Sequence, residues 1–159
     1  MTYDIFIVED NPTKHEEIKA ALPSSCIPTW TTAISQAFKI LENKRWDLII
    51  LDMTFQVLSG SGNEIAKEPL AGIEVLQYLK RRRIEVPVIV ATQHSSFTSN
   101  ERPDIDSIDK LHAMLARLFS PNYRETVRVD LSEDTWKAGL RLAVVRALGG
   151  QLVEDSGSR

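Results

Sequence analysis

Residues 46–52 read Trp-Asp-Leu-Ile-Ile-Leu-Asp, and this run is the strongest strand signal in the chain. Its centre is continuously apolar and does not alternate with polar residues, which is typical of a parallel strand covered on both faces. The run ends on Asp52, so the sequence predicts a carboxylate at the carboxyl end of a central strand.

Similar short apolar runs and helical patterns alternate on both sides of this segment. We predict strands at residues 5–8, 27–32, 46–52, 87–91 and 126–131, and helices at 14–22, 33–43, 70–83, 106–119 and 135–148. This alternation predicts an α/β fold: a doubly wound sheet of five parallel strands, with helices on both faces. We expect one domain over residues 1–150 and a disordered tail over residues 151–159.

A long connection at residues 54–69 interrupts this compact rhythm. It carries a cluster of turn-forming residues, namely Ser59, Gly60, Ser61, Gly62 and Asn63. We therefore predict an inserted loop at about residues 54–69, directly after the central strand.

The bulk composition excludes several classes of function. The 159 residues carry a formal net charge of -3, so no global basic field favours nucleic acid or an anionic membrane. The single cysteine, Cys26, excludes an internal disulfide. The first apolar stretch is too short for a signal peptide or a membrane span. We expect a soluble, cytoplasmic protein, with the basic run 80–83 at the exposed end of a helix.

Acidic side chains follow the predicted strands. Glu9 and Asp10 come after the first strand and Asp52 ends the third, while Thr92 follows the fourth. The carboxyl ends of parallel strands share one edge of a sheet, where ligands collect. Three converging carboxylates repel one another unless a cation neutralises them, and Mg²⁺ prefers such oxygen ligands. The sequence therefore predicts a Mg²⁺ site at this edge.

These signals resemble the receiver domain of two-component response regulators. The resemblance rests on Ile-Val-Glu9-Asp10-Asn11, Leu-Ile-Ile-Leu-Asp52 and Val-Ile-Val-Ala-Thr92, in that order. It implies a flavodoxin-like fold with the strand order 2-1-3-4-5. It also implies that Glu9 and Asp10 hold Mg²⁺ and that Asp52 accepts a phosphoryl group from a histidine kinase. It further implies that the Thr92 hydroxyl follows the phosphoryl group and that the backbone carbonyl of Thr54 is a metal ligand.

The sequence also departs from the receiver pattern. The family's proline and glycine after the acceptor correspond to Pro69 and Gly72, which arrive only after the insertion. The family's lysine at the end of strand five is replaced in our alignment by Asp130, an anion that would add repulsion to the site. Lys137 lies too far along the next helix to substitute for that lysine, whereas Lys67 in the insertion is a candidate.

We therefore expect a stand-alone, atypical receiver in phosphorelay signal transduction. Its output would be protein binding through the helix 4, strand 5 and helix 5 face, with a histidine kinase, another signalling protein or a second copy of the chain as candidate partners. Any enzymatic activity would be limited to self-phosphorylation and dephosphorylation at Asp52. One alternative is a phosphorylation-independent pseudo-receiver that acts as a docking subunit. Another is a Mg²⁺-dependent phosphatase or toprim-like enzyme, although Thr54 stands where these enzymes need a second aspartate.

Overall fold

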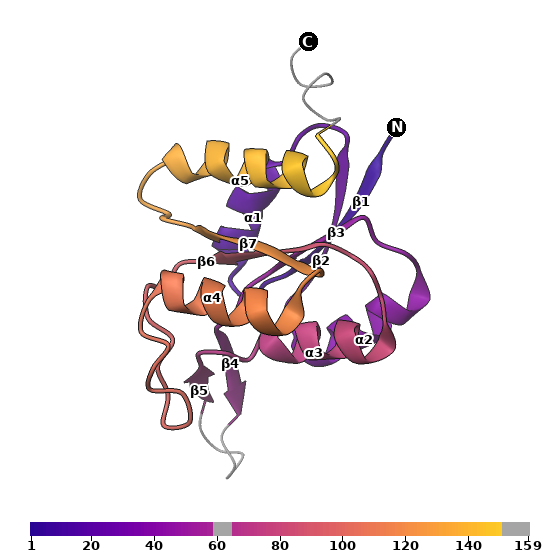
Figure 1. Ribbon diagram of the computed structural model, residues 1–159. Coiled ribbons are helices and arrows are strands. Elements are labelled where there is room, and N and C mark those ends of the chain that lie inside the picture. Colours follow the sequence, from indigo (N-terminus) through magenta and orange to yellow (C-terminus); the bar gives the residue numbers. More distant parts are fainter. Residues whose placement is uncertain (59–64, 151–159) are drawn as a thin grey trace.

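A computed structural model of the chain describes residues 1–58 and 65–150 (Figure 1). The elements in chain order are β1 (Tyr3–Val8), α1 (Pro12–Ala21), β2 (Cys26–Thr31), α2 (Ile34–Asn43), β3 (Leu48–Leu51), β4 (Phe55–Leu58), β5 (Ile65–Glu68), α3 (Ile73–Arg82), β6 (Val88–Thr92), α4 (Ile108–Phe119), β7 (Tyr123–Arg128) and α5 (Thr135–Ala147). Within the described ranges, the helices are all too short or too polar to cross a membrane. The expected tail, residues 151–159, lies outside the described residues.

The main sheet has five parallel strands in the order β2-β1-β3-β6-β7, which confirms the predicted 2-1-3-4-5 order. Helices α1 and α5 cover one face, and α2, α3 and α4 cover the other (Figure 1). Val8 lies beside Leu51, and Leu51 lies beside Val90. Because these strands end in register, the residues that follow β1, β3 and β6 meet at one edge of the sheet.

The strands read as continuous apolar runs because both faces of the sheet are buried. In β1, Phe6 and Val8 pack into the core under α2, α3 and α4. Ile5 and Ile7 point to the opposite face and pack into the core under α1 and α5. Both faces therefore require apolar side chains, and the period-2 alternation of a half-exposed strand is lost.

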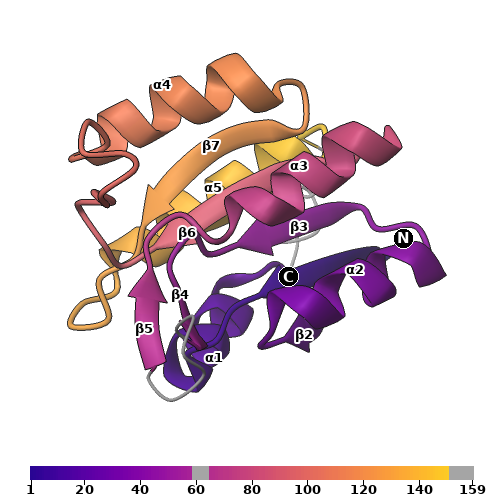
Figure 2. The ribbon, with the colours of Figure 1, turned by 90° about the horizontal axis from the view of Figure 1, so that it is seen from below.

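The insertion contains a β-hairpin and is not a loop throughout. Strands β4 and β5 pair antiparallel from Phe55 opposite Glu68 to Leu58 opposite Ile65, in a small sheet separate from the main one. The hairpin extends from the edge of the main sheet at which β3 ends (Figures 1 and 2). The turn-forming residues 59–63 lie outside the described residues. These turn-forming residues led to the prediction of a loop over the whole insertion. The two flanking strands have only four residues each and were therefore not predicted.

The last strand of the main sheet begins and ends three residues earlier than predicted. We predicted residues 126–131, whereas β7 runs from Tyr123 to Arg128. The alternation of apolar residues continues to Leu131, but the Asp130 carbonyl already accepts from the Glu133 N–H in a turn at 3.1 Å. The alternation of apolar residues therefore continues beyond Arg128, where the strand itself ends. The other predicted helices and strands of the main fold overlap the observed ones.

Gly72 fixes the start of α3 against the end of β3. Its N–H donates to the Met53 carbonyl at 2.9 Å. A Cβ atom added to Gly72 would lie 2.2 Å from the Asp52 carbonyl oxygen, which is far too close. Only glycine, which has no side chain, fits at this position without a shift of the backbone. The glycine lets the chain return from the inserted hairpin directly to the end of the central strand.

The basic run at 80–83 closes α3, as predicted. Arg83 takes a left-handed conformation with φ 57° and ends the helix. Lys80 donates to the Leu118 carbonyl at 2.8 Å, and Arg82 pairs with Glu42 at 2.7 Å. These partners engage two of the basic side chains in contacts within the domain.

Candidate functional site

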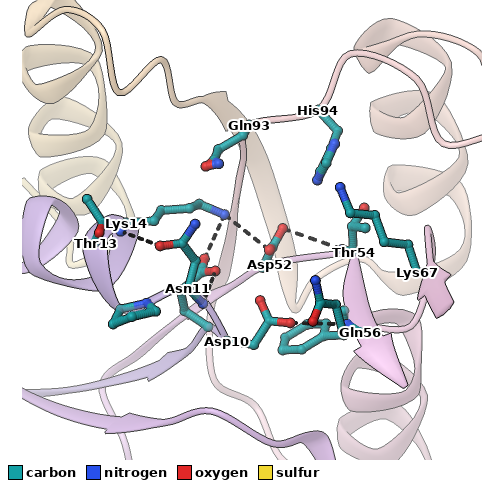
Figure 3. A pocket seen from close by; sticks show the side chains of 13 residues that line it. Asp10, Asn11, Thr13, Lys14, Asp52, Thr54, Gln56, Lys67, Gln93 and His94 are labelled. Atoms are coloured by element: carbon teal, nitrogen blue, oxygen red, sulfur yellow. Dashed lines mark hydrogen bonds and ion pairs between the residues drawn. The ribbon is translucent and has the colours of Figure 1, made fainter. Parts of the chain in front are cut away.

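Three carboxylates meet at the carboxyl edge of the sheet. Glu9 and Asp10 follow β1, Asp52 follows β3, and one oxygen of each lies within 4.8 Å of the others. Glu9 and Asp52 are buried and Asp10 is half-buried. All three line an open pocket of about 430 Å³, shown in Figure 3. The structure thus brings together the acidic side chains that the strand pattern predicted to converge.

A lysine that the sequence analysis did not assign to the site lies among these carboxylates. The Lys14 ammonium is 2.6 Å from Glu9 Oε1 and 3.2 Å from Asp52 Oδ2, and it donates to the Ala91 carbonyl at 2.7 Å. Its side chain is only 1% exposed. An ammonium has three N–H donors, and three acceptors surround this one. The buried positive charge is therefore fully partnered.

The start of α1 places Lys14 in this position. The Asn11 side chain accepts from the Lys14 backbone N–H at 3.1 Å and caps the helix, and Pro12 occupies its first turn. Lys14 also shares a helix face with Ile18 and Ala21, both buried, because residues three and four positions apart lie above one another. That spacing was the available signal that Lys14 points inward.

Glu9 is held from several sides. Its Oε2 accepts from the Asn11 N–H at 3.1 Å, and its backbone carbonyl accepts from the Trp30 indole at 2.6 Å. Burial raises the pKa of Glu9 to about 7; the nearby Asp52 charge acts in the same direction, and Lys14 opposes both. A cation beside Glu9 therefore helps to keep this carboxyl ionised.

Asp52 presents its two oxygens in different directions. Its Oδ1 accepts from the Met53 N–H at 2.8 Å and from the Thr54 N–H at 3.4 Å, while Oδ2 faces Lys14. The Thr54 hydroxyl donates to the Pro69 carbonyl at 3.0 Å, and Thr54 lines the pocket. These bonds fix the Asp52 carboxylate at the pocket wall. The metal-ligand role of the Thr54 carbonyl stays a prediction.

The inserted hairpin forms one wall of the site. The Gln56 backbone N–H donates to Asp10 Oδ2 at 3.1 Å. Phe55 and Lys67 of the hairpin also line the pocket. In the view of Figure 3, Lys14 approaches Asp52 from α1, and Lys67 approaches from the opposite side. The insertion therefore contacts the acidic cluster directly through Asp10.

The end of β6 contributes Gln93 and His94 to the pocket lining. Thr92 is fully buried, and its hydroxyl oxygen accepts from the His94 N–H at 3.1 Å. Burial lowers the pKa of His94, although the Asp52 charge acts in the opposite direction. Thr92 is not among the described residues that line the pocket, so its role toward a phosphoryl group stays a prediction.

Asp130 does not face the carboxylates, contrary to the alignment-based expectation. Its Oδ1 accepts from the backbone N–H and the hydroxyl of Ser132, at 3.0 and 2.6 Å, and these bonds lower its pKa. Asp130 is absent from the described lining of the pocket. The chain turns away after β7, so the Asp130 carboxylate accepts hydrogen bonds within the next loop.

Lys137 also lies away from the site, as predicted. Its ammonium pairs with Glu17 and Asp134.

The donor set suits a hard divalent cation. Mg²⁺ takes carboxylate and carbonyl oxygens together with water, and Glu9, Asp10 and Asp52 supply three carboxylate oxygens within 4.8 Å of one another. Such an ion would neutralise the cluster and stabilise negative charge on a transferring phosphoryl group. In this structure, both oxygens of Glu9 and of Asp52 contact protein donors, with Lys14 on one oxygen of each. Asp10 Oδ2 accepts from the Gln56 N–H.

A doubly wound sheet of five parallel strands, with an acidic pair after the first strand and an aspartate after the third, defines a receiver-type signalling domain. Residues 5–103 match the family model of the response regulator receiver domain, and the chain belongs to this family. Receiver domains are signalling domains that act with histidine kinases and output domains. A search of the curated proteins found no match.

Solved structures share the fold at low sequence identity. The signal receiver domain of a putative LuxO repressor protein from Vibrio parahaemolyticus is 18% identical with a TM-score of 0.60, over 98% of this chain and 96% of that one. The phosphorylated cyanobacterial phytochrome response regulator RcpA is 20% identical with a TM-score of 0.62, over 94% and 96%. A CheY-like receiver domain protein from Methanospirillum hungatei is 15% identical with a TM-score of 0.61, over 97% and 99%.

Proposed function

We propose that this receiver domain takes part in cytoplasmic phosphorelay signalling, with Asp52 as the phosphoacceptor. Glu9 and Asp10, together with the Thr54 backbone carbonyl, would hold the Mg²⁺ that supports the transfer, and Thr92 would contact the phosphoryl group. The observation that carries this proposal is the convergence of three carboxylate oxygens within 4.8 Å of one another in the lining of one pocket.

The proposed step is a simple phosphoryl transfer. An Asp52 carboxylate oxygen forms a bond to phosphorus, and the bond from phosphorus to the donor's nitrogen or oxygen breaks, with its electron pair leaving on the donor. A Mg²⁺ ion held by Glu9 and Asp10 would offset the charge of the phosphoryl oxygens. The Met53 and Thr54 N–H groups hold Asp52 Oδ1, which supports a fixed orientation of the carboxylate.

Incubation with acetyl phosphate and Mg²⁺, followed by intact-mass and peptide analysis, tests this function. We expect one phosphoryl adduct, located on Asp52 and lost in Asp52→Asn. Asp130→Asn is the matched control, because Asp130 also follows a strand at this edge but lies outside the pocket lining. A wild-type protein that forms no adduct, with a donor that phosphorylates a reference receiver, would refute Asp52 as a phosphoacceptor.

The output surface that we propose is the α4–β7–α5 face. On α5, the Leu142 side chain is 55% exposed although it is large and apolar, which favours protein contact. A histidine kinase, another signalling protein or a second copy of the chain would bind there. Leu142→Glu is expected to weaken self-association in sedimentation experiments or binding to a kinase, and Ala20→Glu, which is exposed on α1 outside this face, is the control.

A second candidate is a pseudo-receiver that docks without being phosphorylated. The specific observation in its favour is Lys14, whose ammonium contacts both Glu9 and Asp52 and thus neutralises part of the cluster without a metal. In this case Asp52→Asn would leave partner binding unchanged. We do not propose the phosphatase or toprim-like alternative, since the chain belongs to a family of signalling domains.

A further inference from the structure

The Lys14 ammonium joins three strand ends of the main sheet. It contacts Glu9 after β1, Asp52 after β3 and the Ala91 carbonyl within β6. A buried ammonium is costly unless it is paired and hydrogen-bonded, and here all three of its donors have an acceptor. The site is therefore arranged around a cation that belongs to the protein itself.

This cation contacts two of the three carboxylates that a metal would use, Glu9 and Asp52. Glu9 Oε1 lies 2.6 Å from the ammonium, and no other hydrogen-bond donor reaches this oxygen within the described parts of the chain. A bound Mg²⁺ lies about 2.0–2.1 Å from each ligand oxygen. Two cations sharing Glu9 Oε1 and Asp52 Oδ2 at these distances would repel each other strongly in a buried site.

We propose that Lys14 is a built-in cation of the acidic site, and that a divalent metal ion binds only by displacing the Lys14 ammonium from Glu9 and Asp52. The inference rests on the metal site of the proposed function but not on phosphorylation of Asp52. In the absence of metal, Lys14 holds the carboxylates together. Metal affinity is then set by the exchange of one cation for another, and not by attraction to an empty acidic pocket.

Lys14→Gln and Lys14→Met test the exchange. Titration calorimetry with Mn²⁺ and with Mg²⁺ at about pH 8, above the ordinary pKa of a carboxyl group, gives the affinities. We expect both variants to bind at least about tenfold more tightly than the wild type, because one competing charge has been removed. Lys67→Met is the matched control: it removes an exposed lysine of the same pocket and should change the affinity by much less.

Circular dichroism checks that each variant is folded before titration. Equal or weaker metal binding by a folded Lys14 variant overturns the proposal, as does a rise of the same size in Lys67→Met. Failure of both variants and the wild type to bind either metal at millimolar concentration also overturns it. Tighter binding without any phosphoryl adduct on Asp52 supports the exchange while refuting the phosphoacceptor function, so the two failures are distinguishable.

The wild-type protein offers a second test that does not depend on a variant. A buried ammonium with three acceptors exchanges its protons slowly, so its ¹H–¹⁵N signal is observable in lysine-selective spectra. We expect the Lys14 signal to shift or disappear in step with Mg²⁺ binding, while the half-buried Lys137, which pairs with Glu17 and Asp134 away from the site, gives no such change. A Lys14 signal that stays unchanged at metal saturation overturns the exchange.

Discussion

The Gln56 backbone N–H donates to Asp10 Oδ2 at 3.1 Å, and this bond joins the inserted hairpin to the acidic cluster. Asp10 lies 46 residues before Gln56 in the chain and belongs to the edge of a different sheet. Because Asp10 is also a candidate metal ligand, the position of the hairpin and the state of the site are physically connected through one carboxylate.

Removal of the Asp10 carboxylate should loosen the hairpin at this point. In Asp10→Ala, we expect exchange of the Gln56 amide hydrogen to accelerate by about fivefold, since a hydrogen bond of about 1 kcal/mol is lost. Amide exchange measured by NMR checks this, with the Val57 amide of the same strand as the internal reference. Unchanged exchange at Gln56 would show that the bond contributes nothing to the hairpin's position.

Gly72→Ala should destabilise the domain by about 2–4 kcal/mol, because the added Cβ would lie 2.2 Å from the Asp52 carbonyl oxygen and the backbone must shift. Chemical denaturation gives the free energy of unfolding. Gly139→Ala is the matched control: apart from its chain neighbours and the nearby backbone of α5, no atom lies within 4 Å of the added Cβ, so we expect a gain of up to about 1 kcal/mol. Equal stability of the two variants would contradict the close approach.

Lys14→Met should destabilise the metal-free protein by about 3–5 kcal/mol, because it leaves two buried carboxylates without their cation. Adding Asp52→Asn should recover part of this loss, since one of the two uncompensated charges is then removed. Urea denaturation of the single and double variants yields the coupling free energy. Purely additive changes would show that Lys14 and Asp52 do not interact in solution.

Cys26 should be almost inert toward thiol reagents in the folded protein. Burial raises the pKa of its thiol to about 11, so little thiolate forms near neutral pH. Since the folded pKa is raised above its ordinary value of about 9.0, the stability that this group contributes is complete below pH 9.0 and is lost as the pH rises through about 11. The rate of alkylation by iodoacetamide, measured by mass spectrometry with and without urea, checks this. Equal rates in both conditions would contradict it.

The fold could be predicted because each strand carries its own signal. Residues 48–51 are apolar on both faces, and only a sheet covered on both sides by helices buries all of them. The hairpin could not be predicted in the same way. The described residues of β5 are exposed, so no hydrophobic pattern marks that strand. The predicted end of β7 was wrong by three residues, because apolar residues continue beyond Arg128 to Leu131.

By itself, the sequence determined the parallel strands and the convergence of Glu9, Asp10 and Asp52, because residues that end parallel strands must share an edge of the sheet. The tertiary structure decided which cation lies among them. Asp130 was expected at the site but turns back to Ser132, and Lys14 enters it from α1. The helix spacing marks Lys14 as inward-facing, yet its partner Ala91 is 77 residues away. Only the packing of α1 against three strand ends brings these groups together.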